Sequence, residues 1–190
     1  MTRALAVLTA ALLLVAMSAG VASAREVLLR DAVGDMWLQD QQGNVSEAPN
    51  SRGGDVRRAL FRHGRKNVVV RQRFVDLRRS GEYAQYVIRI KSAKGIFREL
   101  LVEASTGSWA GKSRVFNRRG NRVECSATHN IDYALNVVVM KLPRTCIGTP
   151  RTVRVTASNY RSDVNRHFLM DNPHNTESSA QGWTRWLRVS

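Results

Sequence analysis

The chain has 190 residues and a formal net charge of +15, and hydrophobic residues make up 43% of it. This length suffices for one domain with a hydrophobic core and argues against two domains. Most of the 30 basic residues are Arg, whose guanidinium group matches phosphate and carboxylate anions. The excess of Arg therefore has two explanations, an anionic partner or the codon usage of a GC-rich genome.

The first 24 residues have the three-part pattern of a secretory signal peptide. Arg3 precedes an uncharged apolar run, and Ala22-Ser23-Ala24 supplies the small residues of a cleavage site. We expect cleavage after Ala24, which leaves 25–190 as the single domain of a secreted protein. An uncleaved membrane anchor is the alternative, because the run is about as long as the shortest bilayer spans. No later stretch is apolar for long enough to span a bilayer.

Both cysteines of the chain, Cys125 and Cys146, flank an apolar run that ends at Pro143. In the oxidising compartment that a secreted protein reaches, two cysteines most simply bond to each other. Closing a loop of this length restricts the unfolded chain and stabilises the fold by about 3 kcal/mol. A metal pair or a redox thiol would need Cys-x-x-Cys spacing or nearby ligands, so we expect a structural disulfide.

Short runs rich in Val, Ile and aromatic residues show alternating polarity over most of the chain, and turn-forming residues separate them. In one such run, Ala84, Tyr86, Ile88 and Ile90 form the apolar side. This pattern predicts an all-β fold, namely an antiparallel β-sandwich more than a barrel, with an immunoglobulin-like arrangement as one of two alternatives. We expect strands over 26–31, 55–63, 67–76, 84–92, 97–105, 113–117, 121–128, 134–142, 150–158 and 183–189.

Two long polar stretches, 36–54 and 161–182, interrupt this pattern. Loops of that length in a compact domain are usually functional or disordered. An exported hydrolase is therefore the alternative to a binding protein, with a site in the second stretch. Its candidate residues would be Asp163, His167, Asp171 and His174, and their convergence in one pocket would favour the enzyme.

Several motifs resemble those of small secreted β-sandwich proteins of unknown function from high-GC bacteria. They are Asp-Ala-Val-Gly-Asp at 31–35, Gly-Gly-Asp-Val at 53–56, Leu-Pro-Arg-Thr-Cys-Ile-Gly-Thr-Pro at 142–150 and Val-Arg-Val at 153–155. The resemblance covers nearly all of the chain after residue 24. More distantly, the chain is similar to family-9 carbohydrate-binding (CBM9) and DOMON-like domains. That similarity implies a sandwich fold and transfers no binding residues, because the aromatic and haem-ligand positions of those families have no match here.

The sequence patterns give no support to catalysis. On a strand over 97–105, Glu99 and Glu103 would lie about 13 Å apart, too far for the carboxylate pair of a glycosidase. The four histidines have neither metal-ligand spacing nor a triad motif, and His63 at a strand end is typical of a packed structural residue. We therefore expect a non-enzymatic protein.

Asp31, Asp35 and Asp55 are candidate ligands for calcium, because turns there gather hard carboxylate oxygens. Their spacing does not fit an EF-hand loop, and a single carboxylate can equally cap a turn through its own backbone. We therefore expect no cofactor, with calcium as the alternative.

Basic residues concentrate on one face of the predicted sheet. A hairpin that turns at 64–66 would set Arg58 beside Arg73, and a second that turns at 79–81 would add the strand over 84–92. Six residues would then project from one surface: Arg58, Arg62, Arg71, Arg73, Arg89 and Lys91. Like charges on neighbouring strands repel one another, so this surface favours the binding of an anion. Acidic residues in loops, or solvent, can also screen these charges.

An anionic envelope polymer, a glycan or a lipid headgroup fits an exported protein with such a candidate anion-binding face. Sequence-specific nucleic-acid binding has no support, because no aromatic RNA-binding motif accompanies the Arg residues. The sequence thus favours a secreted, non-enzymatic binding module.

Overall fold

The computed structural model describes residues 25–162, 167–174 and 182–190. The expected signal peptide over 1–24 and the candidate residue Asp163 lie outside the described residues. Within the described ranges, no helix has the length and apolar character needed to cross a membrane.

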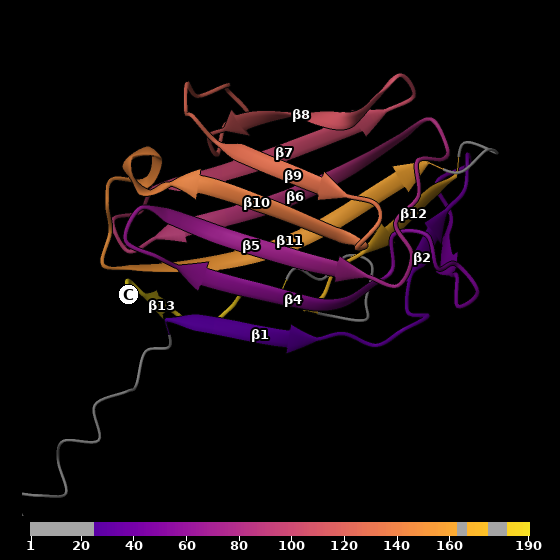
Figure 1. Cartoon of the computed structure of the whole chain (residues 1–190), viewed down its shortest axis with the longest axis horizontal. Coiled ribbons are helices and arrows are strands. Elements are labelled where there is room, and N and C mark those ends of the chain that lie inside the picture. The colour runs from indigo at the N-terminus through magenta and orange to yellow at the C-terminus, as the bar shows by residue number, and fades with distance from the viewer. Residues whose placement is uncertain (1–24, 163–166, 175–181) are drawn as a thin grey trace, which may run out of the picture.

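Strands with alternating polarity build two antiparallel sheets that pack face to face (Figure 1). Sheet A faces the viewer in Figure 1. In spatial order it contains β1 (Glu26–Arg30), β4 (Val56–His63), β5 (Asn67–Phe74), β10 (Val137–Pro143) and β9 (Thr128–Asp132).

Sheet B lies behind sheet A and contains more strands. Its order is β3 (Val45–Glu47), β2 (Trp37–Gln39), β12 (Phe168–Asp171), β11 (Thr152–Ser162), β6 (Tyr83–Ser92), β7 (Phe97–Ser105) and β8 (Ser108–Phe116). The short strand β13 (Leu187–Arg188) also pairs with β11, and a 3-10 helix, η1 (Arg144–Ile147), follows β10. The predicted all-β antiparallel sandwich is confirmed.

The inward side chains of the two sheets form one main hydrophobic core. Phe61 and Phe74 from sheet A meet Tyr86, Ile88 and Leu100 from sheet B, and all five are buried. The rings of Phe74 and Tyr86 pack edge to face with centroids 5.8 Å apart. The alternation predicted for 84–90 is thereby confirmed, because its even-numbered residues fill this core.

His63 lies at the end of β4, where it closes the core. Its ring is fully buried, and its Nδ1 lies 3.1 Å from the carbonyl oxygen of Leu187 in β13. The interpretation of His63 as a packed structural residue is confirmed.

Some strand predictions are wrong. Of the strand expected over 121–128, residues 121–127 form an irregular segment with one isolated bridge, at Arg122, before β9 begins at Thr128. Of the strand expected over 183–189, only β13 forms. Conversely, the polar stretches 36–54 and 161–182 contain the short strands β2, β3 and β12, which extend sheet B. These strands were not predicted, because strands of three or four residues show too little alternation to detect within a polar stretch.

The predicted hairpin between 67–76 and 84–92 is also wrong, because β5 and β6 lie in different sheets. The chain crosses from one sheet to the other at Gly81, whose φ of 82° suits a residue without a Cβ. After the crossing, the hydroxyl oxygen of Ser162 on β11 accepts hydrogen bonds from the N–H groups of Glu82 and Tyr83. These bonds place β6 beside β11 rather than beside β5.

Cys125 and Cys146 form the predicted disulfide, with Cα atoms 5.9 Å apart. Cys125 belongs to the irregular segment before β9, and Cys146 belongs to η1 after β10. The bond therefore ties the two connections that flank this edge of sheet A.

Candidate functional site

The six residues of the predicted anion-binding face lie on two opposite surfaces of the sandwich. Four of them project from the outer face of sheet A: Arg58, Arg62, Arg71 and Arg73. Arg89 and Lys91 project from the outer face of sheet B. The single six-residue face is therefore a wrong prediction, because β6 pairs with β11 and β7 instead of β5.

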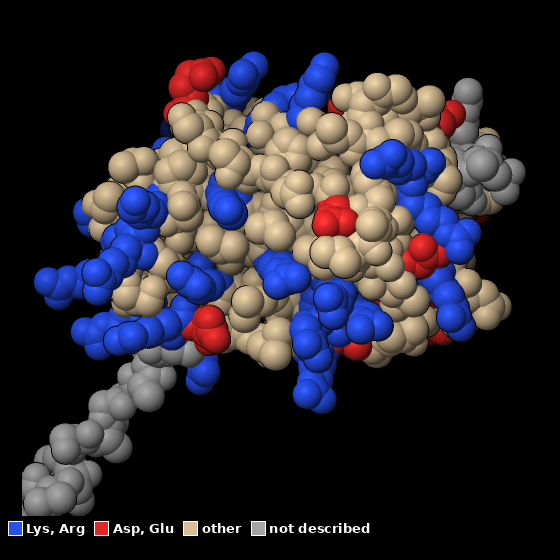
Figure 2. Space-filling model, viewed as in Figure 1, with Lys and Arg blue, Asp and Glu red and all other residues tan. Residues whose placement is uncertain are grey.

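The outer surface of sheet A carries two further cations, which were not among the six predicted residues. Arg30 lies on β1 and Lys141 on β10, and both are exposed. We call the full set the basic face: Arg30, Arg58, Arg62, Arg71, Arg73 and Lys141. Figure 2 shows cationic side chains spread over this side of the molecule. Lys141 had a sequence signal, because it lies between the apolar residues Met140 and Leu142, whereas Arg30 lies between Leu29 and Asp31.

Three arginines of the basic face form a row across neighbouring strands. Arg58 lies opposite Arg30 of β1 on one side and opposite Arg73 of β5 on the other. The predicted pairing of Arg58 with Arg73 is thus confirmed. Among the described residues, no member of the basic face makes an ion pair. The row therefore concentrates positive charge for which the described residues provide no ion pair.

The outer face of sheet B carries cations too, but it partners them. Arg89 makes an ion pair of 2.6 Å with Glu99, and Arg114 makes one of 3.4 Å with Glu103. The ammonium group of Lys91 lies 4.3 Å from the ring centroid of Trp183. The two glutamates therefore act as ion-pair partners of Arg89 and Arg114 on this face.

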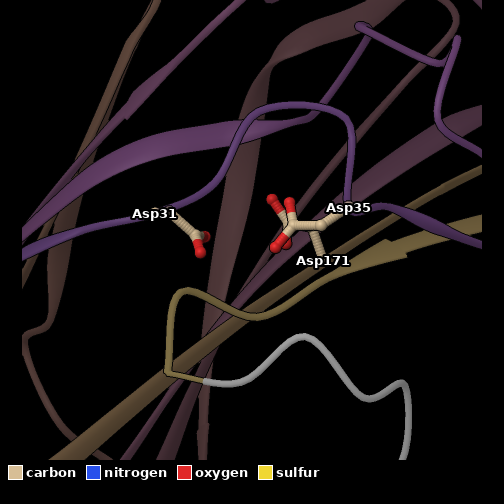
Figure 3. Close-up of side chains that lie close together, drawn as sticks. All are labelled: Asp31, Asp35 and Asp171. Atoms are coloured by element: carbon tan, nitrogen blue, oxygen red, sulfur yellow. The ribbon is translucent and has the colours of Figure 1, made fainter.

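A second cluster gathers carboxylates at one edge of the sandwich, where β1 and β4 of sheet A come near β12 of sheet B. Asp31 directly follows β1, Asp35 lies in the next loop, and Asp171 is the last residue of β12. Each of these three offers an oxygen within 4.8 Å of the others, and Figure 3 shows their carboxyl groups turned toward one another. Asp55, just before β4, adjoins them, because its side chain accepts a hydrogen bond of 2.8 Å from the N–H of Gly34.

Burial makes this carboxylate cluster electrostatically unfavourable. Desolvation, followed by the charges of neighbouring aspartates, raises the pKa of Asp31 to about 9. Burial likewise raises the pKa of Asp171 to about 7, although the N–H of Val56 donates a 2.5 Å hydrogen bond to it. Burial also raises the pKa values of Asp35 and Asp55.

The structure brings together two of the predicted calcium candidates, Asp31 and Asp35, and sets Asp55 against them. It adds Asp171, which sequence reasoning had placed in the alternative hydrolase site. Periodicity gave no signal for this residue, because β12 is short and lies in a polar stretch.

The remaining hydrolase candidates do not join Asp171 in a metal-binding group within the described part of the chain. The imidazole of His174 packs against Phe61 with ring centroids 5.0 Å apart, and its Nε2 is buried without a hydrogen bond. Burial lowers the pKa of His174 to about 4. This environment suits a packed neutral imidazole more than a proton-transfer group.

The buried imidazole of His174 predicts a pH-dependent loss of stability. Unfolded histidine binds a proton below about pH 6.5, whereas the folded imidazole binds one only below about pH 4. Between these values the unfolded state takes up the extra proton, so stability falls as the pH falls. Relative to His174→Phe, we expect the parent to lose about 2 kcal/mol over this interval, a value reduced for partial exposure. Urea denaturation of both proteins at several pH values measures the difference, and a constant difference would contradict it.

Comparison of the chain with protein-family models, curated proteins and solved structures found no match. The class that the structure defines is an antiparallel β-sandwich with one disulfide.

Proposed function

We propose that this protein is a secreted, non-enzymatic binding module that holds an anionic polymer on the basic face of sheet A. The observation that carries the proposal is the row of Arg30, Arg58 and Arg73 on three neighbouring strands, with no ion pair among the described residues. Export is the expectation from the first 24 residues of the sequence.

The contrast between the two outer faces supports a ligand more than an effect of composition alone. Sheet B supplies Glu99 and Glu103 to its arginines as ion-pair partners. Sheet A sets Glu26 opposite Arg62, but it places Arg58 between Arg30 and Arg73. Like charges in directly opposite positions destabilise a sheet, so a bound anion would relieve a repulsion that the fold maintains.

The shape of the basic face suits a polymer. Neighbouring strands lie about 4.8 Å apart, and successive outward residues on one strand lie about 7 Å apart. Cations therefore recur at about 5 Å along the row of Arg30, Arg58 and Arg73, and Arg71 lies about 7 Å from Arg73 on the same strand. This spacing suits the repeated charges of an anionic polymer. A hollow of about 380 Å³ extends this surface at one end, where Arg62 is joined by Arg65 and Lys66.

Charge reversal on the basic face tests the proposal. The mature protein would be titrated with heparin as a model sulfated polysaccharide, and its affinity measured over a series of salt concentrations. We expect Arg71→Glu with Arg73→Glu to weaken binding by roughly tenfold or more at low salt. The affinity of the parent should fall as salt is added, because screening weakens the attraction.

The matched control is Arg118→Glu with Arg119→Glu, which changes the net charge equally in the turn after β8. It should retain most of the affinity. Equal weakening by both double variants would mean that net charge alone governs binding, and absence of any binding would contradict the proposal. Anionic lipid vesicles form a separate arm, and binding to vesicles without binding to the polysaccharide would replace the polymer with a membrane surface.

A further inference from the structure

We propose that Asp31, Asp35, Asp55 and Asp171 form a binding site for one calcium ion that links the two sheets. This site is separate from the basic face and does not depend on the function proposed for it. The site is supported by the arrangement of the oxygens, by the burial of unpaired oxygens and by the chemistry of the donors.

The spacing of the carboxylates fits a shared cation. Oxygen atoms of Asp31, Asp35 and Asp171 all lie within 4.8 Å of one another. Two oxygens that bind the same calcium ion, each at about 2.3–2.6 Å, lie no more than about 5 Å apart. Asp31 and Asp35 come from the one loop after β1, and Asp171 comes from the distant strand β12 (Figure 3). The fold rather than a local turn therefore creates the arrangement.

Oxygens that lack a partner are the second observation. Asp55 has no exposed surface, and its Oδ1 has no hydrogen-bond partner. Its other oxygen binds the N–H of Gly34, next to Asp35, and its charge acts on Asp31 and Asp171, so this carboxylate faces the cluster. Both oxygens of Asp35 and one of Asp31 are likewise buried and unpartnered. Buried carboxylates without partners are costly, and a cation among them removes that cost.

The donor set favours calcium among the common metals. The cluster consists of carboxylates alone and contains neither histidine nor cysteine within the described residues. Zinc and copper prefer nitrogen or sulfur donors, whereas calcium takes six to eight oxygens and accepts irregular geometry. Magnesium requires a near-ideal octahedron and retains several waters, which suits a buried group of four carboxylates less well.

Binding would stabilise the fold, because the four ligands come from both sheets. Asp31 and Asp55 flank strands of sheet A, whereas Asp171 ends β12 of sheet B. A ligand that binds only the folded state raises the melting temperature. At about 100 times its dissociation constant, the rise is roughly 5–10 °C for a domain of this size.

The experiment uses the mature protein after treatment with EDTA and dialysis into metal-free buffer. Calorimetric titration with calcium chloride should give one ion per chain, and the melting temperature should rise by several degrees. Magnesium chloride at the same concentration should give a smaller rise. Absence of both heat and a thermal shift with calcium would overturn the proposal, as would an equal or larger response to magnesium.

Variants separate a metal site from general electrostatics. Asp35→Asn removes one charge from a side chain with no hydrogen-bond partner, so we expect the calcium response to vanish and the metal-free protein to melt higher than the parent. The control is Asp132→Asn on β9 at the far edge of sheet A, which should keep the full response. A calcium response preserved in Asp35→Asn, or lost equally in the control, would overturn the assignment.

Discussion

Replacing Cys125 and Cys146 together with alanine should lower the free energy of unfolding by about 3 kcal/mol. The bond closes a loop with a sequence separation of 21 residues, so its loss enlarges the unfolded ensemble. The segment that holds Cys125 also lacks regular strand pairing, so the disulfide adds to the packing of Val123 and Ala127 against the core. Equilibrium denaturation in guanidinium chloride, with and without the substitutions, measures the difference.

A reductant provides the control for this prediction. The parent protein, unfolded and refolded under reducing conditions, should show the same stability as the double alanine variant. If the free energy of unfolding falls by less than about 1 kcal/mol, the prediction is wrong. The disulfide would then restrict the unfolded chain much less than its loop length implies.

Replacing Gly81 with alanine should destabilise the protein by about 3 kcal/mol or more. A Cβ at this position would clash with the carbonyl oxygen of Ser162, and the φ of 82° is itself unfavourable for alanine. The backbone of β11 or the crossing segment would have to move. Thermal or urea denaturation of Gly81→Ala measures the cost.

Gly107 offers a matched comparison, because its φ is 80° and nothing lies within 4 Å of a Cβ built there. Gly107→Ala should therefore cost only about 1 kcal/mol, the conformational part alone. Similar losses at the two positions would mean that the close approach of the crossing to β11 contributes nothing to stability.

Much of the fold could be predicted from the sequence, because alternation fixes which side of a strand faces the core. Tyr86, Ile88 and Ile90 were placed inside correctly on that basis. The short turn after β4 left few possible registers, so the pairing of Arg58 with Arg73 was also predicted. The disulfide followed from a count of two cysteines and the expected compartment, and the structure confirms the bond.

The candidate sites could be predicted only in part. Arg71 and Arg73 were assigned to an outer surface correctly, but Arg89 lies on the opposite one. Asp31 and Asp35 were selected as oxygen donors, whereas the contribution of Asp171 depends on a strand that periodicity could not detect.

The sequence by itself determined the strand class, the inward and outward positions of the long strands and the cysteine pair. Only the tertiary structure decided which sheet each strand joins, and hence that β6 leaves β5 to pair with β11. In a sandwich, both sheets bury their apolar side in one shared core. A strand therefore has the same alternation of polar and apolar residues in either sheet. An outward arginine on β5 and one on β6 therefore occupy the same kind of position in the alternating pattern, yet they lie on opposite faces of the molecule. Asp31 and Asp171 meet for the complementary reason, because contacts between segments far apart in the chain carry no local signature.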